Sequence, residues 1–197
     1  MLDGCFVFLR MLYKVNTMSS ASRFTTEFID FEDRLRISAA VTEQQVDVVW
    51  LTRRLLDRLV THLGKQLEQT LSAEPRPEAA SMRQSFEQQA AVASYQQQSQ
   101  QQPTPRVDGQ SAAFRHEWLV IEVDITPHAQ GIGLRFRGRT AEQVLQLTMT
   151  AVQLRQWLAI IHSQYVKAQW PMDAWPTWVN DQDIQSVPGE SANTVWH

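Results

Sequence analysis

Arginines that alternate with apolar residues are the polar side chains with the clearest spacing in this sequence. They fall in two runs, RLRISAAV at 34–41 and IGLRFRGR at 132–139. Successive side chains of a strand point to opposite faces, so each run predicts a strand with one buried face and one arginine-bearing face. Guanidinium groups on such a face can bind phosphates or carboxylates. The candidate binding residues are Arg34, Arg36, Arg135, Arg137 and Arg139.

These five guanidinium groups would share one sheet face if the two runs were equivalent. That face would suit an acidic protein partner or the acidic end of the chain itself. It could also bind nucleic acid, but no stacking aromatics alternate with the arginines, and the net charge of the chain is −3, so we do not favour this alternative. The simpler interpretation is that charged side chains keep a sheet face hydrated and protect its edges. Glu27, Glu122 and Asp124 would then neutralise much of the positive charge.

A second candidate surface lies near the end of the sequence. Residues 170–197 contain four of the seven tryptophans and several acidic residues, but no lysine or arginine. Trp170, Trp175 and Trp178 could anchor the segment in a partner's groove, because tryptophan contributes a large contact area at low entropic cost. The alternative is that these tryptophans fold back and cap the core.

Other chemistries find little support in the residue spacing. The five histidines form no ligand pair of helical or strand spacing, and HEWLVIE at 116–122 lacks the second histidine of the zinc-protease pattern. No Gly-x-Ser-x-Gly sequence is present, and Gly131–Gly133 predicts a hairpin turn rather than a phosphate loop. We expect no metal, no cofactor and no enzymatic activity.

Composition places the chain among folded proteins. Hydrophobic residues make up 43% and charged residues 20% of 197 residues, enough to form a core. The only cysteine, Cys5, excludes a disulfide within one chain, and its rarity is typical of cytoplasmic proteins. No apolar run approaches the ~20 residues of a membrane-spanning helix. The leader, residues 1–22, is expected to form a short amphipathic helix. The alternative is that translation begins at Met18, so that the first 17 residues are not part of the protein.

The elements follow the order strand–strand–strand–helix twice. The first unit, 23–71, has expected strands at 24–31, 34–41 and 46–51, followed by a helix capped by Thr52. Its apolar stripe comprises Leu56, Leu59, Val60, Leu63 and Leu67. Gly64 within this helix predicts either a close packing contact or a local end.

The second unit, 111–169, has expected strands at 118–126, 132–139 and 145–149. Thr148 or Thr150 would cap the helix that follows. The expected stripe of this helix is Ala151, Leu154, Leu158, Ile161 and Tyr165.

We therefore predict an α+β fold of two βββα units, related by a possible internal duplication and packed as one pseudo-symmetric domain. Residues 72–110, rich in Gln and Pro, predict a flexible linker in which a transient helix could form around Ala79–Ser94. The tail, 170–197, would be irregular. The expected function is that of a protein-binding adaptor, assembly factor or regulatory subunit. It would serve a partner of unknown identity and could form homo-oligomers, with nucleic-acid binding as the alternative.

Overall fold

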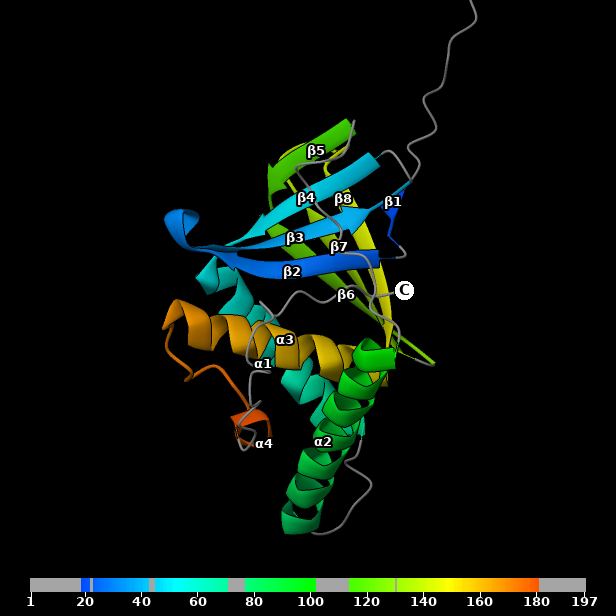
Figure 1. Cartoon of the computed structure of the whole chain (residues 1–197), viewed down its shortest axis with the longest axis vertical. Helices are drawn as coiled ribbons and strands as arrows, with labels where there is room; N and C mark the ends of the chain where they lie inside the picture. Colours follow the sequence, from blue (N-terminus) through cyan, green and yellow to red (C-terminus); the bar gives the residue numbers. More distant parts are fainter. Residues whose placement is uncertain are drawn as a thin grey trace, which may run out of the picture.

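The computed structural model describes residues 19–21, 23–42, 45–70, 77–101, 114–129 and 131–180. Two sheets and several helices make a mixed α+β fold (Figure 1). The strands are β1 (Ser19–Ser20), β2 (Arg23–Ile29), β3 (Arg34–Ala40), β4 (Gln45–Leu51), β5 (Phe114–Leu119), β6 (Glu122–His128), β7 (Gly131–Arg137) and β8 (Val144–Thr150). The helices are α1 (Arg53–Thr70), α2 (Pro77–Gln101), α3 (Ala151–Ala168) and α4 (Thr177–Asn180), with a 3-10 turn, η1 (Asp30–Glu32).

Each sheet combines strands from both halves of the chain. The sheet orders are β2-β3-β4-β5 and β6-β7-β8-β1. In each sheet three consecutive antiparallel strands lead into a helix, and the fourth strand pairs in parallel with the last of the three. That parallel strand comes from the other half in both cases: β5 lies beside β4, and β1 lies beside β8. Neither sheet is therefore complete without the other half.

One apolar core joins the two sheets and the helices. The indole of Trp157 on α3 is fully buried and makes edge-to-face contacts with Phe24 of β2 and Phe136 of β7. Its Nε1–H donates a 3.0 Å hydrogen bond to Oγ1 of Thr26. In Figure 1, α1 and α3 lie together beneath the strands. Each sheet thus turns an apolar face toward the helices. The other face of the β2-β3-β4-β5 sheet carries a separate small apolar cluster of Val46 and Val48, flanked by Ala40 and Trp50.

Local sequence signals locate both long helices that follow the strand triplets. Oγ1 of Thr52 accepts from the amide of Leu55 at 3.3 Å, and Oγ1 of Thr150 accepts from the amide of Gln153 at 3.2 Å. Gln153 returns a bond to the Thr150 amide and so completes a capping box. Both predicted caps are confirmed, and the predicted stripe of α1 is buried throughout. In α3 the predicted stripe is buried except for Ala151, which is exposed.

Gly64 marks a close contact inside α1, as one of the two interpretations predicted. A Cβ at this position would lie 2.5 Å from Cγ of Pro176. The helix continues to Thr70, so the glycine is a packing site and not a helix end.

Two sequence predictions need correction. The single strand expected at 118–126 is two strands, because the chain changes sheets between them: the amide of Val120 bonds to Trp50 of one sheet, and the amide of Ile121 bonds to Arg137 of the other. The flexible linker expected at 72–110 contains the 25-residue helix α2, which packs on α3. Residues 71–76 and 102–113, like the leader up to residue 18, lie outside the described residues.

Candidate functional site

The arginine runs lie on two different sheets. Arg34 and Arg36 belong to β3, whereas Arg135 and Arg137 belong to β7. The apolar faces of both sheets contribute to one core, so the arginine faces point away from it separately. The expectation that all five guanidinium groups share one face is therefore wrong. Arg139 follows the end of β7 and is exposed.

Carboxylates neutralise the strand arginines, as the simpler interpretation predicted. Arg36 donates from Nε to Glu27 Oε1 at 3.0 Å and also binds it through Nη2. Its guanidinium lies 5.8 Å from the ring centroid of Trp50. The neighbouring Arg34 reaches Glu32 at 3.6 Å. These contacts leave little positive charge for a phosphate partner.

The arginine face of the other sheet is neutralised in the same way. Nη2 of Arg137 lies 2.8 Å from Glu122 Oε1 and 3.1 Å from Asp124 Oδ1. Both carboxylates come from the adjacent strand, β6, where Glu122 is directly opposite Arg137.

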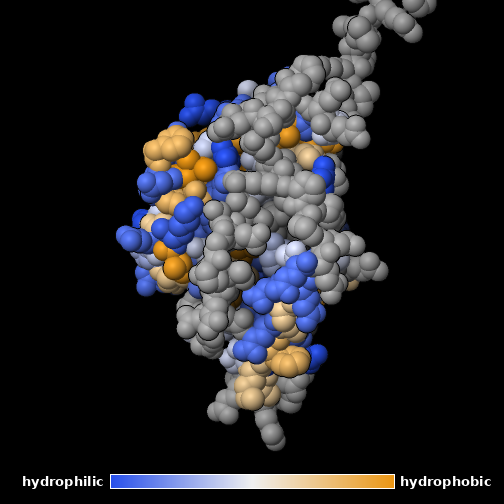
Figure 2. Space-filling model, viewed as in Figure 1, coloured by the Kyte–Doolittle hydropathy of each residue, from blue (hydrophilic) through white to orange (hydrophobic). Residues whose placement is uncertain are grey.

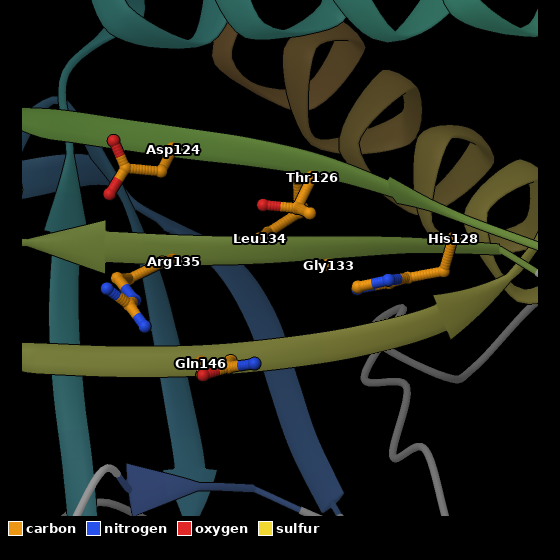
Figure 3. Close-up of a pocket in the computed structure, with 7 residues that line it drawn as sticks. All are labelled: Asp124, Thr126, His128, Gly133, Leu134, Arg135 and Gln146. Carbon is orange, nitrogen blue, oxygen red and sulfur yellow. The ribbon is translucent and has the colours of Figure 1, made fainter.

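A shallow hollow of about 400 Å³ lies on this second sheet face (Figure 3). Gly133 forms its floor, because the missing side chain leaves room for the imidazole of His128, whose Nε2 would lie 2.8 Å from a Cβ added there. Figure 3 shows Arg135 and Gln146 to one side of Gly133 and His128 to the other. Asp124 and Thr126 also line the hollow.

The hollow has the character of a polar binding surface more than of a catalytic centre. General acid–base catalysis needs a titratable side chain oriented by a hydrogen bond. No hydrogen bond within the described residues orients the His128 ring. The carboxylate of Asp124 is occupied by Arg137. A small polar ligand could be held here, but no activated nucleophile faces it.

The tryptophans of the predicted tail are part of the core and are not free anchors. Trp170, Trp175 and Trp178 are 7%, 6% and 3% exposed. The indole N–H of Trp170 donates to Asp33 at 2.8 Å, and that of Trp178 donates to Glu68 at 2.9 Å. The interpretation that these side chains fold back and cap the core is the correct one for this part of the tail. Residues 181–197, including Trp196, lie outside the described residues.

Tyr165 of α3 organises this aromatic cap. Its ring lies between Trp170 and Trp175, with centroid distances of 5.0 and 5.3 Å and edge-to-face geometry. Its hydroxyl donates to Oδ1 of Asp57 at 2.9 Å. Burial, followed by this hydrogen bond and the negative charge of Asp57, raises the pKa of Tyr165 well above its ordinary value. The pair therefore joins α1, α3 and the tail as a neutral phenol bound to a carboxylate.

The structure adds a polar interface that the sequence analysis missed. Arg155 of α3, only 4% exposed, donates to Gln84 Oε1 at 2.6 Å and to Glu87 Oε2 at 2.8 Å, both on α2. Its guanidinium also lies 5.2 Å from the ring centroid of Trp178. Burial lowers the pKa of Arg155, and the charge of Glu87 opposes this shift. Arg155 thus fastens α2 and α4 to α3.

Further glutamine contacts complete this interface. Nε2 of Gln88 donates to the carbonyl of Arg155 at 3.0 Å, and Nε2 of Gln156 donates to the carbonyl of Ala91 at 3.0 Å. Nε2 of Gln84 donates to the carbonyl of Leu67 at 2.8 Å and so ties α2 to the last turns of α1. Unpaired buried amides are costly, so such contacts fix the position of a helix.

The outer face of α2 carries two large apolar residues. Met82 and Phe86 are 74% and 70% exposed. Figure 2 shows apolar side chains gathered on the free end of this helix among hydrophilic ones. Their spacing of four residues is typical of one helix face and is visible in the sequence. The glutamine-rich composition around them instead favoured the prediction of a flexible linker.

Two further features would point to a function: a metal-binding cluster and a membrane-spanning helix. Within the described ranges, no group of three or more His, Cys, Asp or Glu side chains could hold a metal ion. No helix in the described part of the chain is long and apolar enough to cross a membrane. Comparison of the chain with protein-family models, curated proteins and solved structures finds no match.

Proposed function

We propose that this chain is a non-catalytic protein-binding adaptor or assembly factor, and that it presents the outer face of α2 to its partner. One observation carries the proposal: α2 exposes two large apolar side chains although its buried face, which includes Ala91, is partly made of glutamine. Its buried positions include Gln84 and Gln88, whereas Met82 and Phe86 face solvent. Surface helices normally turn their apolar side chains inward. An apolar stripe held outward by a polar interface is suited to contact another molecule.

The spacing of the stripe favours a helix-in-groove contact. Met82 and Phe86 are four residues apart, and the exposed Ala90 and Ala93 continue the same face. Partners that bind helices in this way receive side chains at i, i+4 and i+7 or i+8 in an apolar groove. We infer a protein partner with such a groove, because two large side chains next to small alanines suit close helix packing.

Substitution of both large side chains tests this proposal. Met82→Gln combined with Phe86→Gln keeps good helix formers in α2 and changes no buried contact. We expect unchanged helix content and a midpoint of urea unfolding close to that of the unsubstituted chain. In-cell cross-linking followed by mass spectrometry should lose the cross-links between α2 and its partner.

Val152→Gln is the matched control. Val152 is 52% exposed at the start of α3, so this variant also removes an exposed apolar side chain. It should keep every cross-link. An identical set of cross-links in the α2 variant and in the control would contradict the proposal.

Two finer inferences accompany this function. The shared pattern of the two sheets supports an internal duplication of a βββα unit, because in each sheet an antiparallel triplet receives one parallel strand from the other half. The presence of a single cysteine in the sequence supports a cytoplasmic location. The nucleic-acid alternative has weaker support, because carboxylates face the strand arginines.

A further inference from the structure

An exposed aromatic residue stands at the tip of the β2–β3 hairpin. Phe31 is 86% exposed, more than any other large hydrophobic residue in the described part of the chain. It lies in η1, where the amide of Asp33 bonds to the carbonyl of Asp30 at 3.1 Å. Asp33 adopts a left-handed conformation with φ 48°, and its side chain accepts from Trp170. The tip is therefore ordered, which reduces the entropic cost of placing Phe31 in a contact.

The tip is also acidic. Asp30, Glu32 and Asp33 flank Phe31 and are exposed. Glu32 forms an ion pair with Arg34 at 3.6 Å, and both side chains are 39% exposed. Three carboxylates thus stand against one arginine at the turn, so the tip retains a negative potential around an apolar centre.

The opposite charge lies on the exposed face of α1. Arg54, Arg58 and Lys65 are exposed and lie at intervals of four and seven residues, so they share one face. None of these side chains forms an ion pair within the described residues. Leu55 is half-buried and lies about 60° around the helix from Arg58, so it offers an apolar spot beside that arginine.

The two charged surfaces lie at the same end of the molecule. Leu35, next to the tip on β3, pairs with Leu51, the last residue of β4, and α1 begins two residues later at Arg53. A chain of contacts then links the tip to the first turns of α1: Asp33 binds Trp170, Trp170 packs on Tyr165, and Tyr165 binds Asp57. Figure 1 shows the hairpin tip directly above the start of α1.

We propose that two copies of this chain associate about a two-fold axis, with the acidic tip of each against the basic face of α1 of the other. Phe31 of one copy would pack against Leu55 of its partner copy, beside Arg58. Two patches of opposite charge at one end of a molecule are self-complementary, because a two-fold rotation brings each against its counterpart. A polyanion is a poorer occupant of the α1 face, because the acidic tip beside it would repel one.

Charge reversal in sedimentation velocity experiments on the full chain tests this dimer. At low salt the unsubstituted chain should dimerise at micromolar concentrations, and raising the salt should weaken the dimer, because exposed charges are screened within ~8 Å at physiological ionic strength. Asp30→Lys with Glu32→Lys should give a monomer, because the tip of each copy would then repel the basic α1 face. Arg54→Glu with Arg58→Glu should also give a monomer.

Mixing the two reversed variants is the decisive step. Both contacts regain opposite charges in a mixed dimer, so an equimolar mixture should dimerise although neither variant does so alone. The mixture also excludes misfolding as the cause of the monomers. Phe31→Ser should weaken the dimer of the otherwise unsubstituted chain about tenfold or more, as loss of a central aromatic anchor does. Arg139→Glu, on the other sheet, is the matched control and should leave dimerisation unchanged.

Several results would overturn the proposal. A monomer at about 100 μM protein in low salt would exclude even a weak two-fold contact of this kind. A dimer that tolerates either charge reversal would place the contact elsewhere on the molecule. Reversed variants that stay monomeric when mixed would show that tip and α1 do not meet. The dimer should also persist in the Met82→Gln/Phe86→Gln variant, so this proposal and the α2 proposal can fail separately.

Discussion

The indole of Trp170 donates a hydrogen bond to Asp33 across 137 residues of sequence, with Nε1 and Oδ1 2.8 Å apart. The nearby Trp175 is equally buried, but its Nε1 has no acceptor among the described residues. Two tryptophans of the same segment thus differ in one polar contact. This difference allows the contribution of the hydrogen bond to be separated from that of the apolar ring.

Conversion of each tryptophan to phenylalanine should reveal the difference. Trp170→Phe and Trp175→Phe remove similar apolar volume, but only the first leaves the Asp33 carboxylate without its donor. We expect Trp170→Phe to lose about 1–3 kcal/mol more stability than Trp175→Phe, the usual range for a hydrogen bond to a charged group. Urea unfolding followed by circular dichroism measures both. Equal losses would mean that water replaces the indole donor at Asp33.

Gly64 and Pro176 should be coupled. Gly64→Ala raises the intrinsic helix propensity of α1 by about 1 kcal/mol. The added Cβ, however, would lie 2.5 Å from the ring of Pro176, so we expect a net loss of stability. Pro176→Ala removes the overlapping atoms. Adding Gly64→Ala to the Pro176→Ala variant should therefore cause no loss of stability. Additive effects in this double-mutant cycle would argue against the contact.

Arg155 should control the attachment of α2. Arg155→Met leaves Gln84 and Glu87 without their shared donor and removes the cation–π contact with Trp178. Loss of one partner from a fully buried ion pair costs about 3–5 kcal/mol, and we expect a smaller loss here because the Glu87 side chain is 35% exposed. Hydrogen exchange should show the largest loss of protection at α2, with β3 affected least. Arg83→Met is the control, because that side chain is exposed. Uniform loss of protection would indicate that α2 is not separately attached.

Tyr165 should make the fold sensitive to alkaline pH. Burial and the hydrogen bond to Asp57 raise the pKa of its phenol in the folded state, whereas the pKa of a tyrosine in the unfolded chain is about 10. Below that pH both states are protonated, so the stabilisation is fully present. Above it the unfolded state loses a proton that the folded state keeps, so stability falls as pH rises, by up to about 1.4 kcal/mol per pH unit.

Tyr165→Phe removes this dependence. The stability difference between the unsubstituted chain and the variant should therefore narrow between about pH 10 and 11.5. Urea midpoints across this range measure it. Parallel curves for the two proteins would show that the phenol ionises equally in both states.

Local rules predicted the parts of this fold that depend on neighbouring residues. Thr52 and Thr150 cap helices because a hydroxyl reaches an amide three residues ahead. The stripe of α1 is read from helical spacing alone. Glu27 is predicted to neutralise the strand arginines because it is an acidic neighbour in sequence. In the hairpin it lies directly opposite Arg36.

Predictions failed where partners are distant or ambiguous. Gln84 and Gln88 resemble solvated residues in sequence, and their burial depends on contacts with Arg155, about 70 residues away, and with the carbonyl of Leu67. The parallel pairing of β5 with β4 cannot be read from local pattern, so the change of sheets at Val120 was hidden within one apolar run. The tryptophans of the tail fit an exposed anchor or a buried cap equally well until their acceptors are known.

The exchange of β1 and β5 between the sheets makes the two halves mutually dependent. A chain divided between α1 and α2 would give two pieces, each lacking one strand of its own sheet and carrying an orphan strand that belongs to the other. Neither piece should persist alone, whereas the two refolded together should reassemble without a covalent link. The repeated pattern therefore describes a single cooperative folding unit, which should unfold in one transition and could be split for complementation.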